Sequence, residues 1–326
     1  MAAGAVTVDG TMNTERQGDE RDEKDDALAG LVTEQHRPGF AGLDRLPTAE
    51  IAALMNAEDA RIQAAVAACL PQITAAVDAI AERMSGGGRL IYVGAGTSGR
   101  VGALDASEIP PAFSTSPDQV QAVIAGGPDG LSSAAGDAED DEAAGARDLE
   151  ARTVTERDAV VGISASGSTP YVVGALGRAR EAGALTVALA ANQESAIGGL
   201  ADVTIEVMTG PEFIAGSTRL KAGTAQKLVL NMISTITMIR LGKTYGNLMV
   251  DLQATSAKLR GRARRIVVAA TGTGEEEAAK ALDAAGGDVK TAIAMMLTGA
   301  PAAEAEGALR ASSGRLREAL GRLQRT

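Results

Sequence analysis

The sequence predicts an α/β protein, with a five-stranded parallel sheet sandwiched by helices and a small all-helical C-terminal domain. Two observations predict the sheet: five short apolar runs rich in Val, Leu and Ile recur along the chain, and helical segments separate them. Strands of this kind are typical of parallel sheets that are buried on both faces. The third observation is that the tail, residues 256–326, contains short helical segments broken by Gly-containing turns.

The first 85 residues divide into a charged segment and a helical one. Residues 1–30 are an N-terminal extension that is rich in charge and poor in apolar side chains, so we expect disorder there. A 3.6-residue period follows Leu46. We expect Thr48 to cap the first helix, Pro71 to begin the second and the glycines at 86–88 to end it.

Strands and helices then alternate through the main domain, residues 31–255. The expected strands are residues 89–94, 120–127, 158–164, 185–192 and 203–210. The helices between them include an acidic one over residues 131–152. Residues 219–241 form a long helix that is so apolar that it either lies in the core or packs against a second subunit.

The tail resembles, in outline, the small three-helix bundle of the ubiquitin-associated type. Its helical segments are short, and turns containing glycine separate them. We expect it to pack on the main domain or to mediate dimerisation, rather than to bind another molecule.

Composition limits the possible functions. The net charge of −11 argues against nucleic acid and anionic membranes as partners. The single cysteine, Cys69, lies in an apolar pattern and is expected to be a core thiol. The single histidine, His36, is expected in an exposed loop, and one histidine cannot build a multi-histidine metal site. No apolar run reaches membrane-spanning length and the N-terminus does not read as a signal peptide, which predicts a soluble cytoplasmic protein.

The loop after the first strand, Gly94-Ala-Gly-Thr-Ser-Gly99, matches the G-x-G-x-x-G dinucleotide pattern. That pattern needs a full helix after the glycines and a carboxylate at the tip of the second strand. Pro110-Pro111 is expected to stop the helix after two or three turns. The second strand ends Ala125-Gly-Gly without a carboxylate, and Asp118 precedes it. The sequence therefore disfavours a dinucleotide site.

A second loop, after the third strand, is rich in hydroxyl groups. In a sheet ordered 2-1-3-4-5, the loops after strands one and three flank the ligand crevice. Hydroxyls and backbone N–H groups at two helix starts suit a phosphate dianion. The candidate phosphate-binding residues are Gly96, Thr97, Ser98, Ser164, Ser166, Ser168 and Thr169.

Longer motifs make the chain resemble one family. A five-stranded sheet with two hydroxyl-rich loops resembles the sugar isomerase (SIS) domain, which is flavodoxin-like. Three longer segments of the chain are LIYVGAGTSGRVGALDASEIPP, SASGSTPYVVGAL and STRLKAGTAQKLVLNM. With these segments, the chain resembles, within that superfamily, N-acetylmuramic acid 6-phosphate etherases from about residue 31 to about residue 300.

The resemblance implies a reaction. The family cleaves the D-lactyl ether of N-acetylmuramic acid 6-phosphate with water, giving N-acetylglucosamine 6-phosphate and D-lactate, without a metal or cofactor. Glu108 matches the family's catalytic proton donor and Glu139 its second catalytic glutamate. The resemblance also implies that Lys221 and Thr224 reach the site of their own or of a neighbouring subunit, in a homodimer with sites near the interface. The competing interpretation is that these two residues only form a structural helix start.

Two other functions stay open from the residues alone. One is a non-catalytic sugar-phosphate sensor, like the related glucokinase regulatory protein, although such regulators carry two sugar-binding domains in a longer chain. The other is an aldose–ketose sugar-phosphate isomerase, which also moves protons with carboxylates. A D-lactate assay separates these from an etherase.

Overall fold

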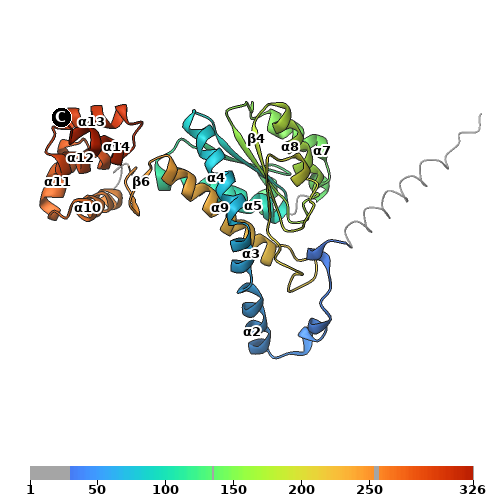
Figure 1. Ribbon diagram of the computed structural model, residues 1–326. Coiled ribbons are helices and arrows are strands. Elements are labelled where there is room, and N and C mark those ends of the chain that lie inside the picture. Colours follow the sequence, from blue (N-terminus) through green and yellow to red (C-terminus); the bar gives the residue numbers. More distant parts are fainter. Residues whose placement is uncertain (1–29, 134–135, 253–256, 326) are drawn as a thin grey trace, which may run out of the picture.

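The computed structural model describes residues 30–133, 136–252 and 257–325 (Figure 1). The predicted disorder of residues 1–30 falls almost wholly outside these ranges. Five strands form one parallel sheet in the predicted order, β2-β1-β3-β4-β5. They are β1 (Leu90–Gly94), β2 (Val120–Ile124), β3 (Ala159–Ile163), β4 (Leu185–Ala190) and β5 (Val203–Glu206).

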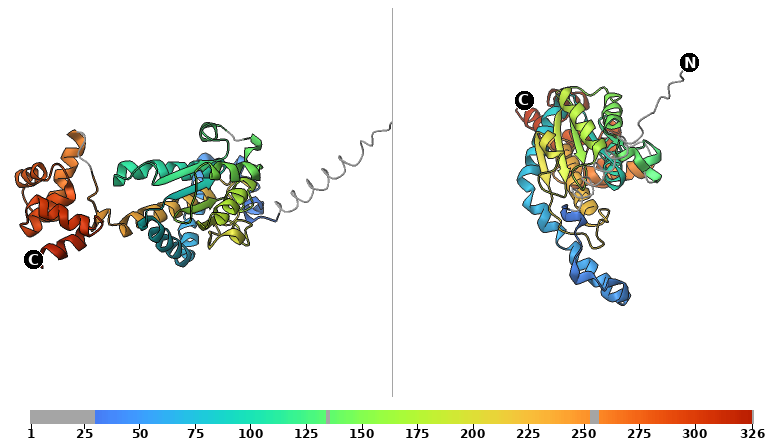
Figure 2. Two further views of the ribbon diagram at one scale, coloured as in Figure 1. Left: turned by 90° about the horizontal axis from the view of Figure 1, so that it is seen from above. Right: turned by 90° about the vertical axis from the view of Figure 1, so that its right-hand side faces the viewer.

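Helices cover both faces of the sheet, as the apolar runs predict. Leu90 and Tyr92 of β1 face a core shared with α4 (Leu70–Ser85), α5 (Gly96–Phe113) and α9 (Lys221–Arg240). The alternate residues Ile91 and Val93 face a second core built with α7 (Glu142–Glu150) and α8 (Pro170–Glu181). Successive strand residues point to opposite faces, so a run that is apolar throughout fills both cores. Figure 2 shows these layers from two further sides.

The N-terminal segment leads into an arm. Three short turns, η1 (Val32–Glu34), η2 (Pro38–Phe40) and η3 (Leu43–Arg45), precede α2 (Thr48–Asp59) and α3 (Ile62–Ala68). α2 projects away from the sheet (Figures 1 and 2). The prediction that Thr48 caps this helix is wrong: Thr48 is its first residue, Pro47 is the N-cap, and no side-chain capping bond forms among the described residues.

The helix after β1 is longer than predicted. Pro110-Pro111 does not stop α5, which continues through both prolines to Phe113 and ends at Ser114 in the left-handed conformation, with φ +50°. Proline's fixed φ is compatible with a helix, and its missing N–H costs less near a helix end that tertiary packing holds in place. Ile109 and Phe113 supply that packing, since both are buried in the core.

The acidic segment is broken where one helix over residues 131–152 was predicted. It forms α6 (Asp129–Ser132), the single turn η4 (Gly136–Glu139) and α7. Asp141 ends the break, because its carboxylate accepts a hydrogen bond at 2.8 Å from the N–H of Ala144 and caps α7.

The C-terminal part has its own core. A hairpin of β6 (Thr244–Tyr245) and β7 (Leu248–Met249) leads into five helices, two more than a three-helix bundle. Val250 and Leu252 already belong to this core, slightly before the predicted boundary at residue 256. The helices are α10 (Ala257–Thr271), α11 (Glu275–Ala284), α12 (Val289–Thr298), α13 (Ala302–Ala311) and α14 (Leu316–Leu323).

Within the described residues, no single helix has the length and apolar character needed to cross a membrane. One pair of helical segments, Thr48–Ala68 and Leu70–Ser85, meets that test only jointly and is bent by 60°.

Candidate active site

The glycine loop joins β1 to α5 by a close approach of backbones. A Cβ atom on Gly94 would lie 2.7 Å from the backbone nitrogen of Gly99, and one on Gly99 would lie 2.6 Å from the side chain of Ile124. Gly96 has φ +51° and its Cβ position faces open space. The outer two glycines of the pattern therefore allow the helix to begin directly at the strand, and the middle one leaves room for a ligand.

The loop after β3 folds around a buried hydroxyl. Ser164 is 2% exposed. Its Oγ lies 2.7 Å from Thr169 Oγ1 and 3.1 Å from Ser166 Oγ, and it accepts a hydrogen bond from the N–H of Gly167. Ser168 is exposed, and its N–H donates to Ser166 Oγ. The four predicted hydroxyl residues of this loop are thus held in one network directly after β3.

The two loops lie side by side. Gly94 at the end of β1 pairs with Ile163 at the end of β3, so both loops leave the same edge of the sheet, here called the carboxyl edge. Neither α5 nor α8 has a side-chain cap among the described residues. The first N–H groups of α5 are left to other acceptors, whereas α8 begins with Pro170, which has no N–H, and the N–H of Val172 donates to the carbonyl of Thr169. The structure therefore brings together two helix starts and the predicted hydroxyl groups, an arrangement suited to an anion.

Helix α9 forms a third wall of this site. A Cβ atom on Gly223 would lie 3.2 Å from Thr97 Cγ2. One turn later, Gln226 accepts a hydrogen bond from Ser98 at 3.1 Å, and both side chains are buried. The first two turns of α9 are therefore packed directly against the glycine loop.

The N-terminal segment crosses the second loop. Asn192, two residues after the end of β4, accepts a hydrogen bond from the N–H of Val32 at 2.8 Å. Its amide nitrogen donates to the carbonyl of Ala165 and to Thr33 Oγ1, and Thr33 is fully buried. Our sequence analysis did not single out Asn192; its position as the last residue of the expected strand 185–192 was the available signal.

Lys221 lies in the first turn of α9, and its side chain is buried. It is 1% exposed, and its Nζ is 3.2 Å from a carboxylate oxygen of Glu58. Glu58 also pairs with Arg37, and its hydrogen bonds from Arg37 and Lys221 outweigh the effect of burial and lower its pKa. The role of Lys221 in substrate binding stays a prediction. Thr224 is exposed, one turn further along α9.

Glu212 holds the start of α9 from outside the helix. Its two carboxylate oxygens accept hydrogen bonds from the N–H groups of Lys221 and Ala222, each at 2.9 Å. Burial raises the pKa of Glu212, and the two backbone bonds partly offset that effect. Because nine residues separate Glu212 from the helix start, no capping pattern in the sequence identifies it.

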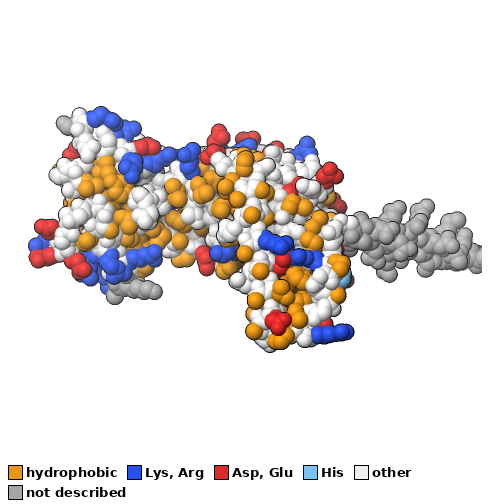
Figure 3. All heavy atoms as spheres, turned by 60° about the horizontal axis from the view of Figure 1, so that its bottom comes forward, with side chains coloured by type: hydrophobic (Ala, Val, Ile, Leu, Met, Phe, Trp, Pro, Cys, Tyr) orange, Lys and Arg blue, Asp and Glu red, His pale blue; other side chains and the backbone are white. Residues whose placement is uncertain are grey.

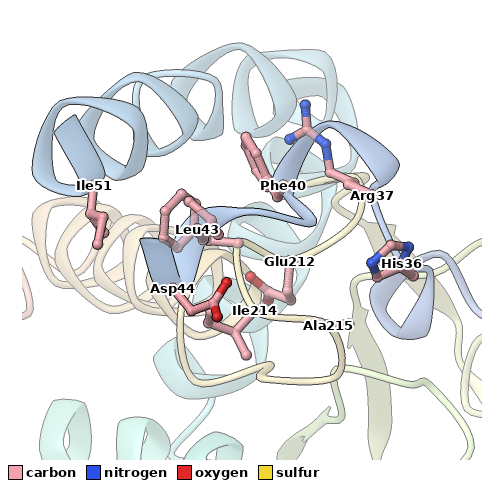
Figure 4. A pocket seen from close by; sticks show the side chains of 10 residues that line it. His36, Arg37, Phe40, Leu43, Asp44, Ile51, Glu212, Ile214 and Ala215 are labelled. Atoms are coloured by element: carbon pink, nitrogen blue, oxygen red, sulfur yellow. The ribbon is translucent and has the colours of Figure 1, made fainter. Parts of the chain in front are cut away.

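A cavity of about 410 Å³ adjoins Glu212. Arg37 and Asp44 of the N-terminal segment line it, and the Arg37 guanidinium lies 4.4 Å from the centre of the Phe40 ring. Figure 4 shows these side chains around the cavity. His36 lies at the same cavity and is exposed, as predicted.

Glu139 lies on the acidic segment between β2 and β3. It is exposed and ends η4, which packs against α8. The preceding residue, Ala138, packs on the core that contains Tyr171 and Val172 from the first turn of α8. Glu139 is thereby held on the face of the sheet that α7 and α8 cover, and its role at the site stays a prediction.

Glu108 lies far from both loops in the same chain. It is exposed on α5, twelve residues after Gly96, which places it ~18 Å along the helix at 1.5 Å per residue. A single chain therefore does not bring Glu108 to the helix start. The separation does not depend on where α5 ends, since Glu108 precedes both prolines and twelve residues of helix already imply it.

A buried carboxylate fixes α5 near Glu108. Asp105 is 7% exposed and accepts hydrogen bonds from Tyr92 at 2.8 Å and Ser234 at 3.1 Å. Burial raises the pKa of Asp105, although these two bonds oppose the shift. Asp105 links the helix to β1 and to α9.

A dinucleotide site is disfavoured by the tip of β2 rather than by helix length. β2 ends at Ile124 and runs into Ala125-Gly126-Gly127, with Asp118 ahead of the strand. Within the described ranges, no group of three or more His, Cys, Asp or Glu side chains is arranged to hold a metal.

Two family models match the chain. Residues 72–180 match the glucokinase regulatory protein N-terminal SIS domain, and residues 138–236 match the SIS domain. Together they cover the sheet, both loops and most of α9.

Curated relatives match nearly the whole chain. It is 58% identical over 293 residues to the N-acetylmuramic acid 6-phosphate etherase of Streptomyces avermitilis, covering 90% of this chain and 94% of that protein. The etherase of Rubrobacter xylanophilus is 56% identical, covering 91% of this chain and 98% of that protein. The etherase of Mycolicibacterium smegmatis is 53% identical, covering 90% and 99%. With this coverage of the fold and of both loops, the chain belongs to the N-acetylmuramic acid 6-phosphate etherase family of SIS-domain proteins.

Proposed function

We propose that this chain cleaves the D-lactyl ether of N-acetylmuramic acid 6-phosphate with water, and that it acts in the cytoplasm. The products are N-acetylglucosamine 6-phosphate and D-lactate. In the open-chain sugar, the aldehyde acidifies the C2 proton. Loss of that proton and breakage of the C3–O bond expel lactate, which takes up a proton. Water then adds to C3 and a proton returns to C2.

The observation that carries this proposal is the paired arrangement of the two loops. The phosphate dianion is bound by the uncapped starts of α5 and α8 and by the hydroxyls of Ser98, Ser164 and Thr169. In a chain with a net charge of −11, an anion is held by such local donors. We call these donors the phosphate cradle.

Glu108 and Glu139 supply the proton transfers. Glu139 lies on η4 beside α8, whereas Glu108 lies ~18 Å along α5 from the cradle. We infer that the working enzyme is a homodimer in which Glu108 of one subunit serves the cradle of its partner.

The surface around Glu108 supports such an interface. Leu104, one turn before Glu108 on α5, is 49% exposed, and Ile236 and Ile239 on α9 are 39% and 46% exposed. The projecting arm adds Leu54, which is 37% exposed. Figure 3 shows hydrophobic side chains grouped on the arm and along the adjoining face of the body. Large exposed apolar side chains grouped on adjacent helices are typical of subunit contacts.

The direct test is release of D-lactate from N-acetylmuramic acid 6-phosphate by the purified full chain. We expect turnover in the wild type and a loss of about a hundredfold or more in Glu108→Gln and in Glu139→Gln, since each removes a proton-transfer group. Sugar-phosphate binding without lactate release would instead favour a sensor. Interconversion of an aldose and a ketose phosphate would favour an isomerase.

Mixing the two inactive variants tests the shared site. If Glu108 and Glu139 act from different subunits, refolding the two variants together produces mixed dimers with one intact site. Lactate release should then reappear in the mixture, although neither variant alone shows it. A mixture as inactive as its components would place both glutamates in one subunit's site.

A further inference from the structure

Gln226 is a buried side chain with one hydrogen bond made and another left open. It lies in the second turn of α9 and is 2% exposed. Its Oε1 accepts a hydrogen bond from Ser98 Oγ at 3.1 Å. Its Nε2 is buried and has no hydrogen-bond partner among the described residues. Buried N–H donors are nearly always paired in folded proteins, so this nitrogen needs an explanation.

The bond as oriented conflicts with anion binding at Ser98. A hydroxyl has one proton. If Ser98 donates that proton to Gln226, only lone pairs face the crevice, and lone pairs repel a phosphate dianion. Nε2 cannot donate to the phosphate in place of the Ser98 hydroxyl, because Nε2 is itself buried.

Rotating the carboxamide by 180° removes the conflict. The rotation exchanges Oε1 and Nε2 with almost no change in shape. Nε2 then donates to Ser98 Oγ, and the Ser98 proton is free to point into the crevice. The oxygen takes the place where the nitrogen had no partner, and a buried carbonyl without a partner is better tolerated than a buried N–H.

We propose that Gln226 is a positioning residue of the phosphate cradle, which donates to Ser98 Oγ and directs the Ser98 proton toward the substrate phosphate. This inference rests on the proposed function, because it assumes that the two loops hold a phosphate. Packing supports the geometry: Gly223, one turn earlier, lies against Thr97, so the distance between α9 and the loop is fixed.

A double-mutant cycle tests whether Gln226 acts through Ser98. The full chain would be titrated with N-acetylglucosamine 6-phosphate in four forms: wild type, Gln226→Met, Ser98→Ala and the double variant. Methionine keeps the length and volume of the side chain but cannot donate. We expect Gln226→Met to weaken binding roughly fivefold in the wild-type background and to have no further effect once Ser98 is alanine.

Thr237 provides a matched control on the same helix. It is fully buried, and its Oγ1 also has no hydrogen-bond partner among the described residues, but it lies eleven residues further along α9. Thr237→Val should leave the affinity unchanged in both backgrounds. In kinetic assays Gln226→Met should raise KM and leave kcat within about twofold, a pattern that a general loss of packing does not give.

Two results would overturn the inference. One is wild-type affinity in Gln226→Met; the other is an equal loss in both backgrounds, which would show that Gln226 does not act through Ser98. If Ser98→Ala itself retains full affinity, the phosphate cradle is wrong, and the inference falls together with that part of the proposed function. If Gln226→Met lowers the melting temperature, the comparison of its effect on binding in the wild-type and Ser98→Ala backgrounds still tests the inference. A packing defect would weaken binding equally in both backgrounds, because it does not depend on the Ser98 hydroxyl.

Discussion

The polar groups at the two ends of the sheet differ in how fully they are hydrogen-bonded within the chain. At the amino end, Asp158 is 2% exposed and accepts bonds from the backbone, Nε and Nη2 of Arg89 and from the N–H of Thr155. At the carboxyl edge, Ser164 and Ser166 bond to other hydroxyls, and α5 and α8 begin without side-chain caps among the described residues.

The difference distinguishes polar groups that stabilise the fold from polar groups that are available to bind a ligand. A carboxylate that is paired with a guanidinium and several N–H groups is satisfied inside the chain, so it stabilises the fold and needs nothing else. Hydroxyls in contact with one another and uncapped helix starts retain hydrogen-bonding capacity for an anion. Substitutions at the amino end should therefore change stability alone, and those in the cradle should change mainly binding.

The largest effect should come from Asp158→Ala. Removing the carboxylate leaves Arg89 and the N–H of Thr155 without their partner, so we expect the free energy of unfolding to fall by about 3 kcal/mol. Urea denaturation measures this. The affinity for N-acetylglucosamine 6-phosphate should be unchanged below the melting transition, and a parallel loss of affinity would remove the distinction between the two ends.

Ser164→Ala should give the converse result. We expect about tenfold weaker sugar-phosphate binding, because a hydroxyl that contacts a charged phosphate oxygen is lost. The free energy of unfolding should fall by only about 1 kcal/mol, since the hydroxyl also supports its own loop. Calorimetric titration and urea denaturation of the same sample compare the two values. Full affinity in this variant would exclude Ser164 from the cradle.

The capped helix α7 should behave like the amino end of the sheet. Asp141 caps α7, so Asp141→Ala should lower stability by about 1 kcal/mol and leave binding unchanged. Asp141→Asn, which keeps an acceptor, is the control and should cost much less. Weaker sugar-phosphate binding in both variants would mean that the charge of Asp141 reaches the site.

Acid pH should remove the stabilisation that the ionised, paired Asp158 contributes. Burial opposes its ionised form, but hydrogen bonds from Arg89 and backbone N–H groups outweigh burial and hold its pKa below the ordinary 3.8. The stability it supplies is therefore present above pH ~4 and is lost as the pH falls through the lowered pKa. Unfolding free energies measured from pH 5 downward should decline less steeply in Asp158→Asn than in the wild type.

Asp105 is the control for Asp158, because its pKa is shifted in the opposite direction. Burial raises its pKa, so its contribution to stability is full below the unfolded pKa and is lost as the pH rises through the folded one. Asp105→Asn should leave the acid decline in place. A flattened decline in this variant would mean that Asp105, not Asp158, is the paired carboxylate.

Much of the fold could be predicted because it depends on local patterns. The five apolar runs became β1 to β5 in the predicted order, and the glycine and serine loops were placed at one edge by that order alone. The end of α5 could not be predicted, since burial of Ile109 and Phe113 outweighs the local effect of two prolines.

The partners of the site were harder to predict than its loops. Lys221 bonds to Glu58, 163 positions away, and Asn192 bonds to Val32, 160 positions away. Hydrogen bonds over such separations leave no periodic signal in one sequence. The same is true of Gln226, whose position relative to Ser98 follows from the packing of α9 on the glycine loop.

The most direct test of the account is a calorimetric titration of the full chain with N-acetylglucosamine 6-phosphate and, separately, with N-acetylglucosamine. If the carboxyl edge is a phosphate cradle, only the phosphorylated sugar should bind, and Ser98→Ala and Ser164→Ala should weaken it while Asp158→Ala does not. Equal affinity for both sugars would contradict the account, because the two loops would then have no role in holding a phosphate.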